Sequence, residues 1–122
     1  MNRSIAAARL RNQRIDGRRG GGDPAAVVSL LGAVQSQEFE AAKWAVGLRM
    51  GAGARDASIE RAFDEGRILR THVLRPTWHF VAPDDIRWML ALTAPHVRRS
   101  LATYHRRLEL GLPLLTRAIQ VV

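Results

Sequence analysis

Cysteine is absent from this sequence, and lysine nearly so: Lys43 is the only lysine among 19 basic residues, and all the others are arginine. Without cysteine, the chain can form neither a disulfide framework nor a thiolate metal site. No apolar run approaches the roughly 18 residues that span a bilayer, and no apolar signal core follows the N-terminal arginines. These absences lead us to expect a cytoplasmic protein with no membrane segment, no metal and no cofactor.

What is present is enough for a small folded domain. The chain has 122 residues, and 47% of them are hydrophobic, so it can bury a core. The formal net charge is +8, and the basic residues gather toward both ends while the middle is mildly acidic. The planar guanidinium of arginine suits bidentate contacts with phosphate. A codon bias of a GC-rich genome also gives many arginines, and the two explanations are compatible.

The hydrophobic pattern predicts helices on both sides of a hairpin. Between Ile68 and Val81 the residues are β-branched and aromatic with a break at Arg75–Pro76, which predicts two short strands. Elsewhere, apolar residues spaced three and four apart favour helices. The expected helices begin near residues 4, 24, 38, 56, 83 and 94.

This order outlines a winged helix, so the predicted fold class is mainly α with a short β-hairpin. We assign residues 1–92 to a winged helix-turn-helix module and residues 93–122 to a further helical region that begins a truncated second module. The final "LLTRAIQVV" is amphipathic and has no cap or polar tail, which leads us to expect a fragment of a longer architecture. Trp44, Trp78 and Trp88 are expected in the core, although an exposed tryptophan could stack on a base.

The stretch "AVQSQEFEAAKW" is unusual because Gln35 and Gln37 flank Ser36 between two helical patterns. In an α-helix, residues i and i+2 point about 200° apart, whereas in an extended link they point to the same side. The two amides can therefore act together only in a non-helical junction. There they could orient a water molecule without strongly activating it, since an amide does not titrate usefully. The alternative is that both side chains serve only local backbone hydrogen bonds.

Three segments carry a resemblance to a known family: "LRNQRIDG", "VVSLLGAVQSQEFEAAKWAVGLR" and "RILRTHVLRPTWHFVAPDDIRWMLAL". They resemble the N-terminal part of winged-helix DNA-binding proteins related to the AlkZ and YcaQ DNA glycosylases. The resemblance runs from about Leu10 to Leu92 and covers about the first third of a typical family member. It implies tandem winged helices that grip duplex DNA. It also implies monofunctional hydrolysis of the N-glycosidic bond of N7-alkylated purines, which repairs alkylation damage.

The resemblance gives the glutamine pair a role. In those glycosylases a glutamine–x–glutamine or glutamine–x–aspartate motif serves the catalytic water, and Gln35 and Gln37 stand where that motif stands. The resemblance thus implies that both are catalytic and orient water toward C1′ of the damaged nucleotide. Ser36 between them is less apolar than the usual residue at that place. The alternatives are a non-enzymatic, regulatory DNA-binding winged-helix protein and an inactive truncated remnant.

A second family motif lies in the predicted hairpin. The family pattern of arginine, four residues, arginine, glycine, threonine, x and histidine is matched here by Arg70, Arg75, Thr77 and His79. Pro76 replaces the usual glycine at the turn. The resemblance implies that Arg75, Thr77 and His79 contact DNA. For His79, the alternative is a buried histidine that only bonds the backbone.

Duplex DNA is the expected partner, and its phosphates would meet arginine clusters. The helix before the hairpin carries Glu60, Asp64 and Glu65, which would repel phosphate, so we interpret that helix as a scaffold rather than a groove-reading element. Phosphate contacts give sequence-blind, salt-dependent binding. A solvated arginine face is the alternative for both clusters. The clusters are Arg9, Arg11, Arg14, Arg18 and Arg19 near the N-terminus, and Arg98, Arg99, Arg106 and Arg107 later in the chain.

Overall fold

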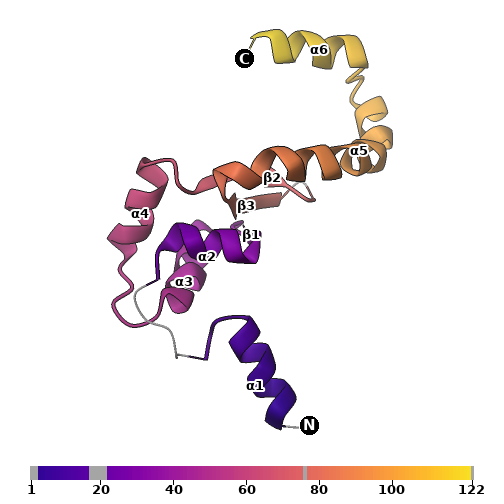
Figure 1. Ribbon diagram of the computed structural model, residues 1–122. Helices are drawn as coiled ribbons and strands as arrows, with labels where there is room; N and C mark the ends of the chain where they lie inside the picture. Colours follow the sequence, from indigo (N-terminus) through magenta and orange to yellow (C-terminus); the bar gives the residue numbers. More distant parts are fainter. Residues whose placement is uncertain (1–2, 17–21, 76, 122) are drawn as a thin grey trace.

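The computed structural model describes residues 3–16, 22–75 and 77–121, in which six helices and three strands form. The prediction of a mainly α fold with a short β-hairpin is confirmed (Figure 1). The helices are α1 (Arg3–Asn12), α2 (Pro24–Leu31), α3 (Phe39–Met50), α4 (Asp56–Asp64), α5 (Pro83–Arg107) and α6 (Leu112–Val121). The strands are β1 (Ala33–Gln35), β2 (Leu69–Val73) and β3 (Thr77–Val81).

Local sequence sets both ends of α2. The Asp23 side chain accepts a hydrogen bond from the Ala26 N–H at 3.2 Å, and Pro24 occupies the first turn. Proline suits this position because the first-turn N–H groups have no partner inside the helix. The helix ends at Gly32, whose φ of 74° lies in the left-handed region that glycine tolerates. The chain then leaves α2 in the extended conformation that forms β1.

The sheet has three antiparallel strands in the order β1–β3–β2. The predicted hairpin of β2 and β3 is present, but the prediction missed β1. In β1, Val34 pairs with Phe80, and on the other side of β3 the same Phe80 pairs with Arg70. The missed strand is only three residues long, and in the sequence it looks like the end of the α2 apolar pattern. It forms because the edge of β3 offers backbone partners to the segment that leaves α2. The resulting order α2–β1–α3–α4–β2–β3 is that of a winged helix.

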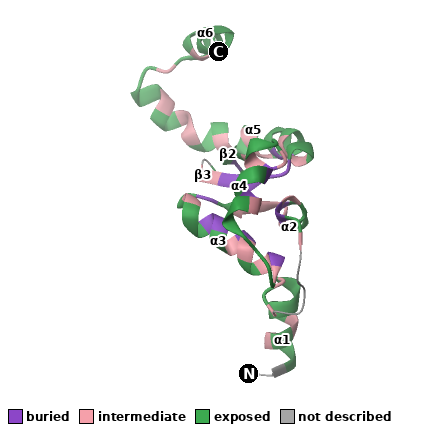
Figure 2. Cartoon of the chain, turned by 90° about the vertical axis from the view of Figure 1, so that its left-hand side faces the viewer, coloured by how far each residue is buried: buried purple, intermediate pink, exposed green. Residues whose placement is uncertain are grey.

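The main core lies between one face of the sheet and helices α2, α3 and α4. Phe80 is fully buried there, and its ring meets Phe63 and Phe39 at centroid distances of 4.8 and 5.6 Å. Burial of one such ring contributes about 1.5–3 kcal/mol. Figure 2 shows the buried residues gathered in these central elements. The cluster comprises Val27, Val28, Ala42, Val46, Met50, Ile59, Ala62, Ile68 and Phe80.

Helix α5 covers the opposite face of the sheet. Met89 packs there against Val73 and Val81 in a second, smaller core cluster. The two helices predicted after the hairpin are in fact one, since α5 continues from Pro83 to Arg107 with Pro95 inside it. Proline removes one helical hydrogen bond, but here the freed carbonyl belongs to the exposed residue 91, where water can reach it. The boundary between a module at 1–92 and a segment at 93–122 therefore falls within a continuous helix and stays a prediction.

Two tryptophans lie outside the core that was expected to hold them. Trp44 is 69% exposed and Trp88 is 52% exposed. On α3 the buried positions are instead Ala42, Val46 and Met50, so the face that packs is rotated from the one that Trp44 occupies. Trp88 lies in the first half of α5 and donates its indole N–H to Asp85 at 2.7 Å. Aliphatic and phenyl side chains fill the core between α2, α3 and α4, and these two indoles remain at the surface.

Helices α1 and α6 lie at opposite ends of the molecule (Figure 1). None of the described residues of α6 is buried, although Leu112 and Ile119 are large and apolar. Helix α1 is likewise mostly exposed (Figure 2). The described chain therefore has one compact centre, built from α2 to the first half of α5, with a projecting helix on either side.

Candidate functional site

The Gln35–Ser36–Gln37 segment links β1 to α3 and is not helical. Gln35 is the last residue of β1, and α3 begins at Phe39, two residues after Gln37. Ser36 is fully buried, while the glutamines on either side are exposed. This alternation is typical of an extended chain, in which residues i and i+2 lie on the same side. The segment is thus the non-helical junction that a joint role of the two amides requires.

Backbone contacts with β3 hold the end of this segment. The Ser36 N–H donates to the Trp78 carbonyl at 2.7 Å, which extends the β1–β3 pairing by one residue. The Trp78 N–H donates to the side-chain Oε1 of Gln37 at 3.4 Å, a long hydrogen bond. Because a backbone N–H only donates, it fixes which end of the Gln37 amide faces β3. The NH₂ group of Gln37 therefore faces away from Trp78.

Arg70, on β2, reaches across the sheet to the same segment. Its guanidinium donates to the Ser36 carbonyl from Nε at 3.3 Å and from Nη2 at 3.0 Å, and Nη2 lies 3.5 Å from the Gln37 carbonyl. The guanidinium also lies over the rings of Trp78 at 4.6 Å and Phe39 at 5.4 Å. Arg70 was not among the site residues predicted from the sequence. Two signals were available: Arg70 is the first arginine of the family pattern in the hairpin, and strand alternation places it on the sheet face of Phe80, toward α3.

The opposite face of the sheet carries a polar row next to Gln35. Gln35 pairs with His79, and His79 pairs with Thr71 on β2. His79 is only 8% exposed, and its Nδ1 lies 2.9 Å from the Thr77 carbonyl. The structure thus contains the backbone-bonded, buried histidine that the sequence offered as one alternative. Thr77 is half-buried at the start of β3.

The β2–β3 turn lies at the same end of the sheet as Gln37. Arg75 in this turn is exposed, and its carbonyl accepts a hydrogen bond from the Thr77 N–H at 2.6 Å. Leu74 has a φ of 64°, a left-handed conformation that is uncommon outside glycine. Pro76, which replaces the family glycine, lies outside the described residues. The fold therefore pairs His79 with Gln35, and it places Arg75 and Thr77 at the end of the sheet toward which the glutamine segment runs.

The predicted arginine clusters are not part of this assembly. Arg9 and Arg11 are exposed on α1, and Arg14 follows with a φ of 52°. Arg18 and Arg19 lie outside the described residues. The second cluster lies on α5 beyond Pro95, where its side chains are exposed. Its members are Arg98, Arg99, Arg106 and Arg107.

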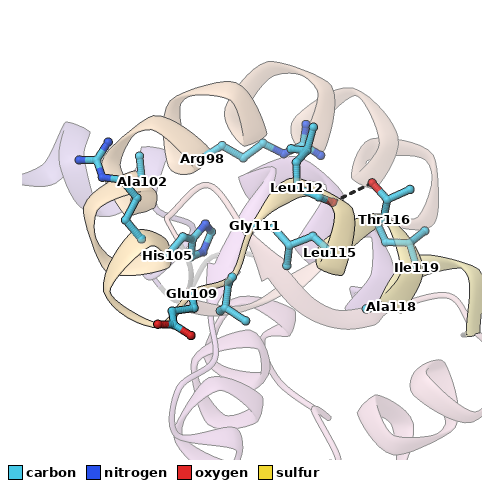
Figure 3. Close-up of a pocket in the computed structure, with 12 residues that line it drawn as sticks. Arg98, Ala102, His105, Glu109, Gly111, Leu112, Leu115, Thr116, Ala118 and Ile119 are labelled. Atoms are coloured by element: carbon cyan, nitrogen blue, oxygen red, sulfur yellow. Dashed lines mark hydrogen bonds between the residues drawn. The ribbon is translucent and has the colours of Figure 1, made fainter.

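Two members of the second cluster line a groove between α5 and α6. The groove has a volume of about 1180 Å³, and Figure 3 shows Arg98 and His105 beside the apolar side chains Leu112 and Leu115. Arg106 also lines it. This groove is separate from the glutamine segment, none of whose residues contributes to it.

Lys43, the single lysine, is buried on α3 and surrounded by carboxylates. Its Nζ lies 3.0 Å from Asp56, 3.1 Å from Glu60 and 3.1 Å from Glu40. The hydrogen bond to Asp56 raises the pKa of Lys43, burial opposes this, and Glu40 and Glu60 raise it further. The amine therefore stays protonated. Two of these acids belong to α4, so the buried ammonium offsets part of that helix's negative charge.

Neither a membrane span nor a metal cluster is found in the part of the chain that the structure describes. Within residues 3–16, 22–75 and 77–121, no helix is long and apolar enough to cross a membrane. Over the same ranges, no group of three or more histidine or acidic side chains is arranged to bind a metal ion.

Comparison with known proteins adds the family. A model of the family described as DNA glycosylase AlkZ-like matches residues 28–122, well over half of the chain. The chain belongs to the AlkZ-like DNA glycosylase family. The matched region contains β1, the glutamine segment, Arg70 and the hairpin turn, so the AlkZ-like part of the chain includes the whole assembly described above.

A solved structure of a DNA glycosylase is similar to this AlkZ-like chain. Streptomyces sahachiroi DNA glycosylase AlkZ superimposes with a TM-score of 0.68 at 26% sequence identity. The match covers 82% of this chain and 28% of that protein, so the chain spans less than a third of its solved relative. No curated protein matches the sequence.

Proposed function

We propose that this chain binds duplex DNA and that Gln35 and Gln37 orient the water that hydrolyses the N-glycosidic bond of an N7-alkylated purine nucleotide. The observation that carries the proposal is the arrangement of the segment: two exposed glutamines flank a buried serine in extended backbone at the edge of the sheet. Such backbone directs both amides to one side, where they can share a ligand. Membership of the AlkZ-like family gives that ligand its chemistry.

The proposed reaction suits residues that position rather than ionise. Alkylation at N7 leaves the purine with a positive charge, so the electron pair of the C1′–N9 bond neutralises the base as it leaves. The water oxygen then bonds to C1′, and its proton passes to solvent. An amide accepts and donates hydrogen bonds but is a poor base, so Gln35 and Gln37 would act by orienting the water. The products are the free alkylated base and an abasic site.

The surroundings of Lys43 favour a reaction in which water, and not a lysine amine, attacks the sugar. Glycosylases that also cut the strand need a neutral amine that forms a Schiff base with the sugar. Lys43 is the only lysine of the chain, it is buried, and its three carboxylate neighbours raise its pKa and keep it charged. A charged, enclosed ammonium is no nucleophile. The expected activity is therefore monofunctional, with no strand cleavage by lysine.

DNA would approach the end of the sheet that carries the hairpin turn. Arg75 is exposed in the turn that precedes β3, and on β3 the Trp78 N–H donates to Gln37. We propose that Arg75 and Thr77 contact the backbone beside the damaged nucleotide. His79, which is nearly buried, would support the strand and Gln35 more than touch DNA. The exposed arginines of α1 and α5 would add phosphate contacts further away.

The test is release of N7-methylguanine from duplex DNA at low salt, measured under single-turnover conditions. The wild-type chain is compared with Gln35→Ala, Gln37→Ala and, as a matched control, Gln120→Ala, an exposed glutamine on α6. We expect each of the first two substitutions to lower the rate of base release by about 10²-fold, because displacing a reacting group by about 1 Å slows a reaction by about that factor. DNA affinity, measured by fluorescence anisotropy, should not change.

Two results would contradict this proposal. Base release that is equally fast with Gln37→Ala would remove the segment from the reaction. Salt-sensitive DNA binding without any base release would favour the second candidate, a DNA-binding protein without catalysis. That candidate has an observation behind it, because the chain spans only 28% of the solved glycosylase that it resembles.

A further inference from the structure

The glutamine segment departs from a regular β-ladder at one bond. In an antiparallel ladder, the two residues of a hydrogen-bonded pair form two bonds, because the N–H of each donates to the carbonyl of the other. Ser36 and Trp78 exchange only one, from the Ser36 N–H to the Trp78 carbonyl. The other two groups have changed partners: the Trp78 N–H binds Oε1 of Gln37, and the Ser36 carbonyl binds Arg70.

These two exchanges depend on each other. If the Ser36 carbonyl returned to Trp78, it would take the N–H that orients the Gln37 amide. Arg70 prevents this because it holds the Ser36 carbonyl with two donors, Nε at 3.3 Å and Nη2 at 3.0 Å. Its Nη2 also lies 3.5 Å from the Gln37 carbonyl. One guanidinium from β2 thus bridges two consecutive carbonyls of the glutamine segment.

Arg70 is itself held in place. Its guanidinium lies 4.6 Å from the ring centroid of Trp78 and 5.4 Å from that of Phe39, the first residue of α3. Such contacts between a planar cation and aromatic faces are favourable and directional. The Trp78 ring in turn meets the ring of His72 at 4.0 Å. The ring contacts with Trp78 of β3 and Phe39 of α3 therefore fix the orientation of the Arg70 guanidinium.

We infer that Arg70 is a positioning residue: it holds the Ser36 and Gln37 carbonyls so that the Gln37 amide is aimed by Trp78 and faces the same side as Gln35. The inference rests on the proposed function, since it assigns Arg70 a part in the water-orienting site. Arg70 touches neither the water nor the base. Its geometry requires a planar fork with several donors, which lysine lacks.

The experiment compares wild type with Arg70→Lys and Arg70→Gln, and uses Arg87→Lys as a control at an exposed arginine of α5. The first readout is nuclear magnetic resonance of ¹⁵N-labelled protein. We expect faster hydrogen exchange of the Trp78 N–H and shifted side-chain amide signals of Gln37 in both Arg70 variants. The control should change neither signal. Thermal unfolding of each variant shows whether the fold is retained.

The second readout is base release at saturating DNA, together with DNA affinity. Both Arg70 variants should release base about tenfold to about 10²-fold more slowly, while the affinity of Arg70→Lys stays that of wild type. If Arg70 instead contacted a DNA phosphate, Arg70→Lys would keep both the affinity and the rate of wild type. Arg70→Gln would then lower the slope of log DNA affinity against log salt by about one. That second pattern would overturn the inference.

The two readouts separate the inference from the function on which it rests. If the Trp78 and Gln37 signals of a folded Arg70→Lys protein match those of wild type, Arg70 does not position the segment, whatever the rate. If these signals change but wild type releases no base, Arg70 holds the segment and the proposed glycosylase activity is wrong. Changed signals together with slower release at unchanged affinity would establish Arg70 as a positioning residue of the reaction.

Discussion

At the scale of single residues, Ser36 has the least favourable surroundings in the segment. Its side chain is fully buried, and among the described residues its hydroxyl has no hydrogen-bond partner. A buried hydroxyl without a partner costs about 1–3 kcal/mol. The contacts that hold the segment use the backbone N–H and carbonyl of Ser36 rather than its side chain. The hydroxyl can therefore be removed without loosening the glutamines.

We predict that Ser36→Ala raises the free energy of unfolding by about 1 kcal/mol, because it removes an unsatisfied polar group and leaves only a small void. Urea denaturation measures this. Ser100→Ala is the control, since the exposed Ser100 hydroxyl bonds the Val97 carbonyl and its loss should change stability little. A less stable Ser36→Ala protein would mean that a bound water satisfies the hydroxyl. Base release should be unaffected in either variant.

At the scale of elements, one buried ammonium joins α3 to α4. Lys43 on α3 binds Asp56 and Glu60, which both lie on α4. These acids explain why α4 does not resemble a groove-reading helix: the exposed Glu60 pairs with the buried Lys43, and Glu65, just beyond α4, binds Arg67. The interpretation of α4 as a scaffold agrees with these contacts.

The raised pKa of Lys43 predicts how stability depends on pH. A base whose pKa is raised on folding contributes stability in full below its ordinary value of 10.5, and loses that contribution as pH rises through the raised value. We expect the free energy of unfolding to fall as pH increases above 10.5. Lys43→Met should be less stable near neutral pH and should show a shallower alkaline decline.

Denaturant titrations at several alkaline pH values measure this decline. Tyr104 is the single tyrosine and is present in both proteins, so its own titration cancels when the two slopes are compared. Equal slopes for wild type and Lys43→Met would show that the ion pairs at Asp56 and Glu60 add nothing to the stability of the fold.

At the scale of the whole molecule, basic residues lie on elements that are far apart. Arg9 and Arg11 lie on α1, whereas Arg98, Arg99 and Arg106 lie on the second half of α5, and α1 and α6 occupy opposite ends (Figure 1). Charges spread in this way would bind phosphates over an extended length of duplex. Each phosphate that is neutralised contributes about 0.9 to the slope of log affinity against log salt.

We predict that replacing Arg98, Arg99 and Arg106 by glutamine weakens DNA binding and lowers the salt slope by about 0.9 for each phosphate that the variant no longer binds. Anisotropy titrations between about 50 mM and about 200 mM salt give the slope. Arg117→Gln on α6 is the control for the loss of one positive charge. An unchanged slope in the triple variant would mean that these arginines form only a solvated face.

How much the sequence could predict depended on distance along the chain. The helix start at Asp23–Pro24, the hairpin and the non-helical glutamine segment follow from neighbouring residues, whose backbone preferences and spacing are visible in the sequence. Strand β1 was missed because three residues carry too little pattern. The exposure of Trp44 was missed because the periodicity of α3 does not tell which of its apolar faces meets α2 and α4.

The sequence by itself determined a mainly α protein with a hairpin, two glutamines one residue apart and a single lysine. Only the tertiary structure decided what surrounds them. Arg70 lies 34 residues from Ser36, and Lys43 lies 17 residues from Glu60. Contacts over such separations arise from strand pairing and helix packing, which depend on the whole core rather than on any local preference. The sequence therefore pointed to the glutamines, and the fold showed what holds them.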